Sequence, residues 1–301
     1  YGYYLALFLS LSLLGLIVIL SLNWYRKRRR HWQSLNLKVL QIRIPRTGDE
    51  GRSDPLKEIN LSEQLFSSLS SINEPFAFEI AVKNIGEEIN FYLAVPRAHV
   101  DFAKRAIQGL FLEARVEEAP DYTIFQPHGT AVAGYLATDK SYLLPVSTYA
   151  EVQADVFGPI LSTLSRVRDT NEGVALQLVI LPAGSSTKKR ISSGLEELKK
   201  GVKFSKIATA GDINAKEFYT VLAGSNKKEE SKEKQIDEDM IKAVSLKLAK
   251  PLFVVNARII ASSLDQNRAE DLFLSIASAL TKFSSPIRNS FKIIKPKKIR
   301  S

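Results

Sequence analysis

The sequence predicts an α+β protein in which an N-terminal transmembrane helix precedes two tandem ferredoxin-like (βαββαβ) domains, the second with a charged insertion. Three observations predict this. Residues 1–22 contain no charged side chain. From residue 37 onward, strand-like and helix-like stretches follow one another twice in the order strand, helix, strand, strand, helix, strand. Residues 185–249, rich in Lys, Glu and Ser, interrupt the second copy.

The first 25 residues are predicted to form the transmembrane helix. About 20 apolar residues rising 1.5 Å each cross a hydrocarbon core of about 30 Å. A secretory signal peptide would have its cations before the apolar stretch, whereas here they follow it. The basic segment 26–36 then indicates an inner-membrane protein with a single span and a cytoplasmic globular part. The residues expected at the membrane interface are Trp24, Tyr25, Arg26, Lys27, Arg28, Arg29 and Arg30.

The first ferredoxin-like domain is predicted over residues 37–120. Residues 37–44, 76–82 and 89–95 alternate between apolar and other side chains, which is typical of strands. Asp54-Pro55 is a good helix start, because aspartate caps a helix and proline suits its first turn. A second helical stripe covers residues 102–110, and a short strand ends the unit before Pro120.

The second domain is predicted over residues 121–294, with the insertion at 185–249 and a basic tail at 295–301. Strands are expected near 142–146, 174–180, 252–261 and 291–294, with helices over 157–167 and 272–283. The insertion would lie in the central connection between two strands. A charged insertion of this kind is either a solvated excursion or an arm that docks a partner.

The net charge of +10 is concentrated at the two ends of the chain. Residues 26–30 carry five cations, residues 282–301 carry seven and no acid, and the remainder sums to −2. A near-neutral body does not favour a general nucleic-acid-binding surface. The basic C-terminal residues could contact lipid, contact nucleic acid, or be a solvated linker. The residues concerned are Lys292, Lys295, Lys297, Lys298 and Arg300.

No catalytic or cofactor-binding constellation is present in the sequence. The chain has no cysteine, so disulfides and thiolate metal sites are excluded, and its three histidines are scattered. No G-x-x-x-x-G-K-[ST] loop, G-x-S-x-G elbow, H-E-x-x-H pair or G-x-G-x-x-G turn occurs. The chain is therefore predicted to be no enzyme and to need no cofactor or metal.

Several short strings carry a family resemblance: the stretch 37–46, Ser62-Glu-Gln-Leu-Phe66, Phe91-Tyr-Leu-Ala-Val-Pro96, Gln108-Gly109-Leu110 and Val116-Glu-Glu118. Together they resemble the membrane-proximal N-terminal region of type IV secretion and conjugation ATPases, the TraG-like members of the HerA/FtsK superfamily from candidate-phylum bacteria. In that family a membrane segment and a domain of unknown function precede a P-loop DNA-translocase motor. The chain contains no such motor, so no ATPase residue carries over.

The resemblance implies a non-catalytic, membrane-anchored cytoplasmic module that tethers and assembles a type IV secretion or DNA-translocase ATPase at the membrane. Its expected partners are the membrane and proteins, either components of the ATPase and secretion machinery or a second copy of the chain. The alternative is a nucleic-acid-binding module that guides DNA to such a motor through the basic tail.

Overall fold

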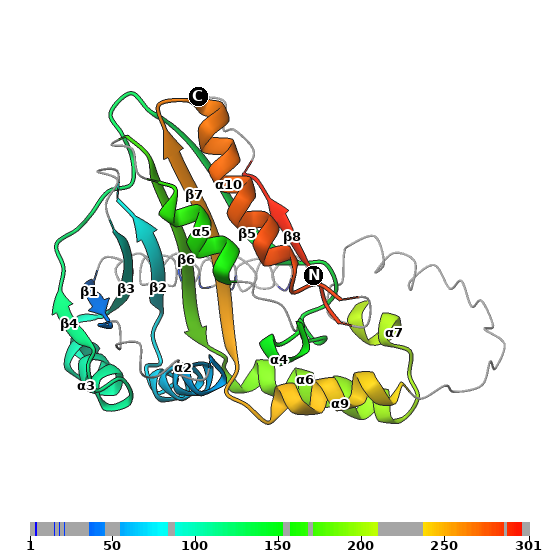
Figure 1. The fold of residues 1–301 in the computed structure, drawn as a ribbon. Coiled ribbons are helices and arrows are strands. Elements are labelled where there is room, and N and C mark those ends of the chain that lie inside the picture. Colours follow the sequence, from blue (N-terminus) through cyan, green and yellow to red (C-terminus); the bar gives the residue numbers. More distant parts are fainter. Residues whose placement is uncertain are drawn as a thin grey trace.

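A computed structural model describes residues 4, 15, 18, 21, 36–45, 55–83, 88–152, 157–167, 171–209, 237–285 and 288–296 (Figure 1). The first half of the chain contains β1 (Leu37–Arg43), α2 (Pro55–Leu69), β2 (Phe76–Val82), β3 (Ile89–Pro96), a 3-10 turn (Arg97–His99), α3 (Val100–Leu110) and β4 (Arg115–Glu118). The second half contains β5 (Thr130–Thr138), α4 (Tyr149–Val152), α5 (Phe157–Ser165), β6 (Gly173–Pro182), α6 (Ser185–Lys199), α7 (Phe204–Thr209), α9 (Glu238–Leu248), β7 (Phe253–Ser263), α10 (Gln266–Thr281) and β8 (Phe291–Ile294).

All eight strands belong to one sheet, in the order β4-β1-β3-β2-β6-β7-β5-β8, and every neighbouring pair is antiparallel. The predicted division into two tandem ferredoxin-like domains, each with its own sheet, is therefore wrong. Strand β2 pairs with β6 along its whole length, from Phe76 opposite Ile180 to Val82 opposite Val174. Each half has the strand order of a split βαβ unit. The edge strand of the first half, β2, hydrogen-bonds to the edge strand of the second half, β6. Pairing these strands satisfies backbone groups that two separate sheets would leave at open edges.

The predicted transmembrane helix over residues 1–25 is also corrected. Among the residues that the structure describes, no helix is long and apolar enough to cross a membrane. The longest of these helices, α10, has 16 residues and so spans about 24 Å, less than the hydrocarbon thickness of about 30 Å. This finding overturns the transmembrane-helix prediction, and the single-pass anchor is not supported. Most of residues 1–25, and Arg26 to Arg30 with them, lie outside the described residues.

Four helices cover one face of the sheet. Helices α2 and α3 pack on the strands of the first half through Leu69 and Ile107, and α5 and α10 pack on those of the second half through Ile160 and Phe273. In Figure 1, α5 and α10 cross the front of the sheet. Phe78 and Phe91 contact both of these clusters, so the apolar core is continuous across the junction of β2 and β6.

The opposite face of the sheet carries a row of polar side chains, one from each of five successive strands. The registers place in line Gln41, Tyr92, Glu79, Gln177 and Arg258. The Glu79 carboxylate accepts hydrogen bonds from the Tyr122 hydroxyl and from the Gln177 side-chain amide. Arg258 Nη1 in turn donates to Gln177 Oε1 at 3.3 Å. Side-chain bonds thus reinforce the β2–β6 junction that the backbone ladder makes.

The segment after β4 lies against this face. The Tyr122 ring stacks on Tyr92 with centroids 4.3 Å apart. Ile124 approaches β6 so closely that a Cβ on Gly173 would lie 2.2 Å from the Ile124 carbonyl oxygen, which leaves room only for glycine. Burial and the hydrogen bond to Glu79 raise the pKa of Tyr122 well above its usual range. The hydroxyl therefore remains a donor to Glu79 at every physiological pH.

The described residues of the insertion, 185–209 and 237–249, form a helical hairpin with its own small core. Helices α6 and α9 lie side by side, with α7 beyond the end of α6 (Figure 1). They bury Ile191, Leu195, Ile207 and Val244 together with Leu143 from the loop after β5.

Asn289 joins β8 to the loop that follows β5. Its side chain is 0% exposed. Its amide nitrogen donates to the carbonyl oxygens of Lys140, Ser141 and Leu144 at 2.9–3.2 Å. Its amide oxygen accepts from the Lys140 and Ser290 backbone N–H groups at 2.9 and 3.0 Å. One buried side chain therefore satisfies backbone N–H and carbonyl groups that, in a regular sheet, a neighbouring strand would satisfy.

We expect Tyr122→Phe to lower the free energy of unfolding by about 1.5 kcal/mol, because a half-buried carboxylate loses a donor. The raised pKa of Tyr122 gives stability that is complete below the unfolded-state pKa of about 10 and is lost as pH rises toward the folded-state value. Urea unfolding at several alkaline pH values should therefore show a shallower decline for the variant than for the parent. Tyr135→Phe is the control, because the Tyr135 side chain lies on the same face and is 40% exposed. It should change neither the free energy of unfolding nor its decline at alkaline pH. Equal alkaline profiles for parent and Tyr122→Phe would contradict the assignment.

We expect Asn289→Ala to cost about 3 kcal/mol, because several buried backbone groups lose their partner at once. Asn256→Ala, an exposed position on β7, is the matched control and should stay within about 0.5 kcal/mol of the parent. Chemical denaturation of both variants measures the difference. A cost for Asn289→Ala no larger than that of the control would show that the loop does not depend on this side chain.

Candidate functional site

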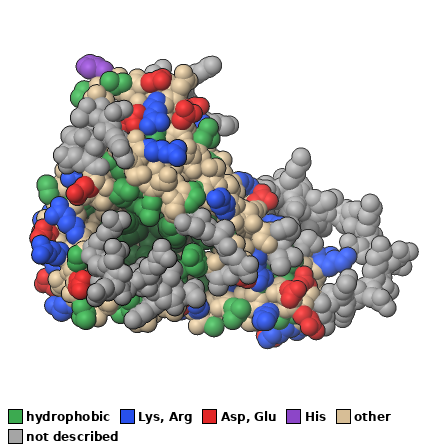
Figure 2. Space-filling model, in the orientation of Figure 1, with side chains coloured by type: hydrophobic (Ala, Val, Ile, Leu, Met, Phe, Trp, Pro, Cys, Tyr) green, Lys and Arg blue, Asp and Glu red, His purple; other side chains and the backbone are tan. Residues whose placement is uncertain are grey.

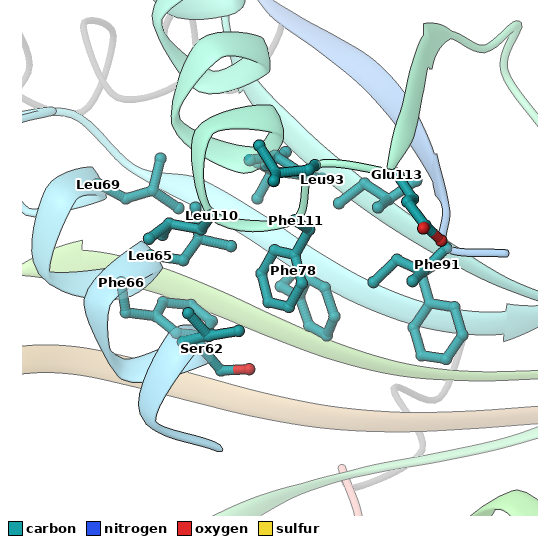
Figure 3. Close-up of a pocket in the computed structure, with 15 residues that line it drawn as sticks. Ser62, Leu65, Phe66, Leu69, Phe78, Phe91, Leu93, Leu110, Phe111 and Glu113 are labelled. Carbon is teal, nitrogen blue, oxygen red and sulfur yellow. The ribbon is translucent and has the colours of Figure 1, made fainter. Parts of the chain in front are cut away.

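An apolar groove lies between α2, α3 and the helix-covered face of β1, β2 and β3. Its volume is about 650 Å³. Figure 3 shows α2 and the end of α3 on either side of the strand residues, and Figure 2 shows a hollow lined by hydrophobic side chains on the face that carries the helices. The lining residues are Ile42, Ile44, Leu61, Ser62, Leu65, Phe66, Leu69, Phe78, Phe91, Leu93, Ile107, Leu110, Phe111, Leu112 and Glu113.

The groove follows from two sequence periodicities. On α2, Leu61, Leu65 and Leu69 recur every four residues and so face the same side of the helix. On the strands, Phe91 and Leu93 are two residues apart and point to the same face. Large side chains thus project from the helices and from the sheet into one space.

Aromatic rings form the floor of the groove. The Phe66 ring meets the Phe78 ring edge-on, with centroids 6.3 Å apart and planes at 79°. Phe66 makes a second edge contact with Phe253 at 6.4 Å, and Phe78 lies 6.5 Å from Phe91. These distances are in the favourable range for aromatic pairs, so the floor is held in shape by contacts among its own rings.

The mouth of the groove extends its apolar surface into solvent. Leu112 is 87% exposed and Ile44 is 59% exposed, although both line the groove. Only two of the fifteen lining residues are polar, Ser62 and Glu113, and Figure 3 shows them on opposite sides of the groove. A carboxylate without a second titratable side chain beside it cannot form an acid–base pair. The arrangement can bind an apolar surface and can attract one positive charge.

Of the sequence-predicted site residues, the structure describes only Lys292 and Lys295. Lys292 lies 3.6 Å from Asp139, and Lys295 pairs with Glu270 at 3.2 Å and lies over the Phe273 ring. Both predicted contact residues thus already have acidic partners. Lys297, Lys298 and Arg300 lie outside the described residues, as do the interface residues Trp24 to Arg30. In the part of the chain that the structure describes, no group of three His, Cys, Asp or Glu side chains could hold a metal ion.

The groove itself was not predicted from the sequence. The only signal that could have pointed to it is the apolar run Leu110-Phe111-Leu112 at the end of a helix, where polar residues are usual.

One comparison with known proteins gives a match. The sequence profile of the family described as "Domain of unknown function (DUF8128)" matches residues 56–293. This range covers most of the chain and all of the lining residues of the groove except Ile42 and Ile44. A comparison with curated proteins gives no match.

We expect the full chain to bind a neutral apolar dye such as Nile red in the groove, with a gain in fluorescence. Ile44→Asp and Leu112→Asp should each weaken dye binding about tenfold, because each removes an apolar contact of about 1.5 kcal/mol. Both side chains are largely exposed, so the fold should tolerate the changes. Leu274→Asp, at a position on α10 that is 50% exposed and far from the groove in sequence, is the control. Dye affinity reduced equally in all three variants would show that the dye binds elsewhere.

Proposed function

We propose that this chain, which belongs to the DUF8128 family of domains of unknown function, is a non-catalytic binding module that assembles with a DNA-translocase or type IV secretion ATPase. The observation that carries the proposal is the open apolar groove, with its exposed mouth and its single carboxylate. The transmembrane anchor is not part of the proposal.

The occupant we assign to the groove is an amphipathic helix of the ATPase. A groove walled by two helices and floored by strands can accept the apolar face of a third helix, anchored by side chains at i, i+3 or i+4, and i+7. The exposed side chains of Ile44 and Leu112 favour a protein partner, because they continue the apolar surface beyond the hollow. A specific small-molecule site would need several converging polar groups, whereas this lining offers Ser62 and Glu113 on opposite sides.

Glu113 sets the charge that the partner must carry. Among the described residues that line the groove it is the one with a charge, and it lies beside the apolar run 110–112. A helix whose apolar face is followed by Lys or Arg would place that cation near the carboxylate. Such a pair at the rim of an interface affects the association rate and its salt dependence more than the final affinity.

The class of partner comes from the resemblance of the sequence to the N-terminal region of TraG-like ATPases. The strings that carry this resemblance include Ser62 to Phe66 on α2 and Phe91 to Pro96 on β3, and both contribute side chains to the groove. These parts of the resemblance therefore coincide with the binding surface. This coincidence supports a link between the groove and the motor.

The test is a calorimetric titration of the full chain with the purified P-loop translocase ATPase encoded in the same genome. We expect a one-to-one complex that Ile44→Asp and Leu112→Asp each weaken about tenfold. In stopped-flow measurements with the same ATPase, Glu113→Gln should slow association at low salt and flatten the salt dependence of the association rate. Leu274→Asp, which removes a half-exposed apolar side chain from α10, should bind like the parent.

Two results would overturn the proposal. One is an ATPase that binds equally well to the parent and to both groove variants, which would place its contact elsewhere. The other is a small apolar ligand retained in the groove in native mass spectrometry, combined with no measurable binding of the ATPase. Circular dichroism and thermal unfolding of each variant separate these results from a misfolded variant, because neither measurement depends on the apolar contacts that the variants remove.

A further inference from the structure

Charge is strongly segregated between the helical insertion and the rest of the body. Residues 185–250 have a net charge of +5, whereas residues 31–184 and 251–281 together have a net charge of −7. The near-zero sum over the whole body therefore hides two regions of opposite sign. The insertion is thus the basic part of a body whose other residues carry a net negative charge.

The topology of the insertion concentrates this charge further. Strands β6 and β7, which lead into and out of the hairpin, pair with Pro182 opposite Phe253. The start of α6 and the end of α9 therefore lie together, and the two helices run antiparallel beside each other. Residues 183–195 and 240–252 contain no acid. Their cations are Lys188, Lys189, Arg190, Lys242, Lys247 and Lys250.

Three of these six cations are held by neighbouring groups. Lys247 donates to the Tyr142 backbone carbonyl, Arg190 lies 5.5 Å over the Tyr142 ring, and Lys250 pairs with Glu63 of α2 at 2.7 Å. Lys188, Lys189 and Lys242 are exposed, and no ion pair to them is recorded within the described residues. We call the surface formed by Lys188, Lys189 and Arg190, at the start of α6, the basic end of the hairpin.

The other end of the hairpin provides an internal comparison. The acidic residues of the described hairpin are all found there: Glu196, Glu197, Asp237, Glu238 and Asp239. Lys199, Lys200 and Lys203 lie among these acids, and Lys199 pairs with Glu196 at 3.1 Å. This end therefore has as many cations as the basic end, but nearby acids compensate their positive charge.

We propose that the basic end of the hairpin binds the phosphate backbone of a nucleic acid. Clustered cations without local acids release counterions from a polyanion, which is the main source of sequence-independent nucleic-acid affinity. The Tyr142 ring, 40% exposed and already paired with Arg190, offers an aromatic surface beside the cations, as in proteins that hold single strands. An acidic protein surface would not need such a ring. The site shares no residue with the apolar groove and does not depend on the function proposed for it.

The test is fluorescence anisotropy of the full chain with labelled single-stranded and double-stranded oligonucleotides between about 50 and 200 mM NaCl. The probe variant is the triple change Lys188→Gln, Lys189→Gln and Arg190→Gln. The matched control is Lys199→Gln, Lys200→Gln and Lys203→Gln, which changes the net charge by the same amount at the other end. Circular dichroism and thermal unfolding of both variants check that the hairpin remains folded.

We expect parent affinity to fall steeply with salt. The basic-end variant should lose about tenfold or more in affinity at low salt, and its salt slope should decrease by roughly one for each phosphate contact removed. The control variant should lose less than about threefold. Equal losses in the two variants would overturn the proposal, because they would reflect net charge alone. Absence of binding at the lowest salt, or binding to phosphatidylserine vesicles without binding to either oligonucleotide, would also overturn it.

Discussion

The antiparallel pairing of β2 with β6 is the constraint on which the rest of the structure depends. Each strand lies at the edge of its half of the sheet. Their seven paired positions join two four-stranded halves into one eight-stranded sheet. The same pairing aligns Glu79 with Gln177 and brings Phe78 into contact with the cores of both halves. A backbone ladder thus determines where the core is continuous and where polar groups meet. The groove and the hairpin have fixed positions because the sheet between them is one layer.

The two halves cover the same sheet face with different results. In the second half, α10 buries small side chains such as Ala269 and Ala277 and inserts the Phe273 ring above Gly134, where a Cβ would lie 2.7 Å from the ring. Small residues let the helix approach closely, so no space is left. In the first half, Leu65 and Phe66 on α2 hold the helix away from the strands, and the intervening space becomes the groove. Side-chain size therefore determines which half has a surface available for binding.

Much of the local structure could be predicted from the sequence. Alternation at period two along Phe76 to Val82 identifies a strand, since side chains on one face must be apolar if that face is buried. Periodicity contains no information on which distant strand will be the neighbour, and so the β2–β6 junction was missed. The groove was missed because Leu65 and Phe66 have the same spacing whether a neighbour covers them or not. The basic end was missed because charge was summed along the chain, whereas hairpin topology brings residues 188–190 and 247–250 together.

The strand order also limits how the protein can associate with itself. The outermost strands of the described sheet, β4 and β8, have only four residues each, whereas the central β6 and β7 have ten and eleven. Charged side chains, Arg115 and Glu117 at one margin and Lys292 at the other, accompany the unpaired backbone groups. Short, charged margins are poor templates for another strand, and this discourages open-ended sheet growth. The two halves of the sheet are joined by backbone pairing of their edge strands. The short, charged outer strands disfavour the same pairing between two molecules, and the protein should therefore resist fibril formation.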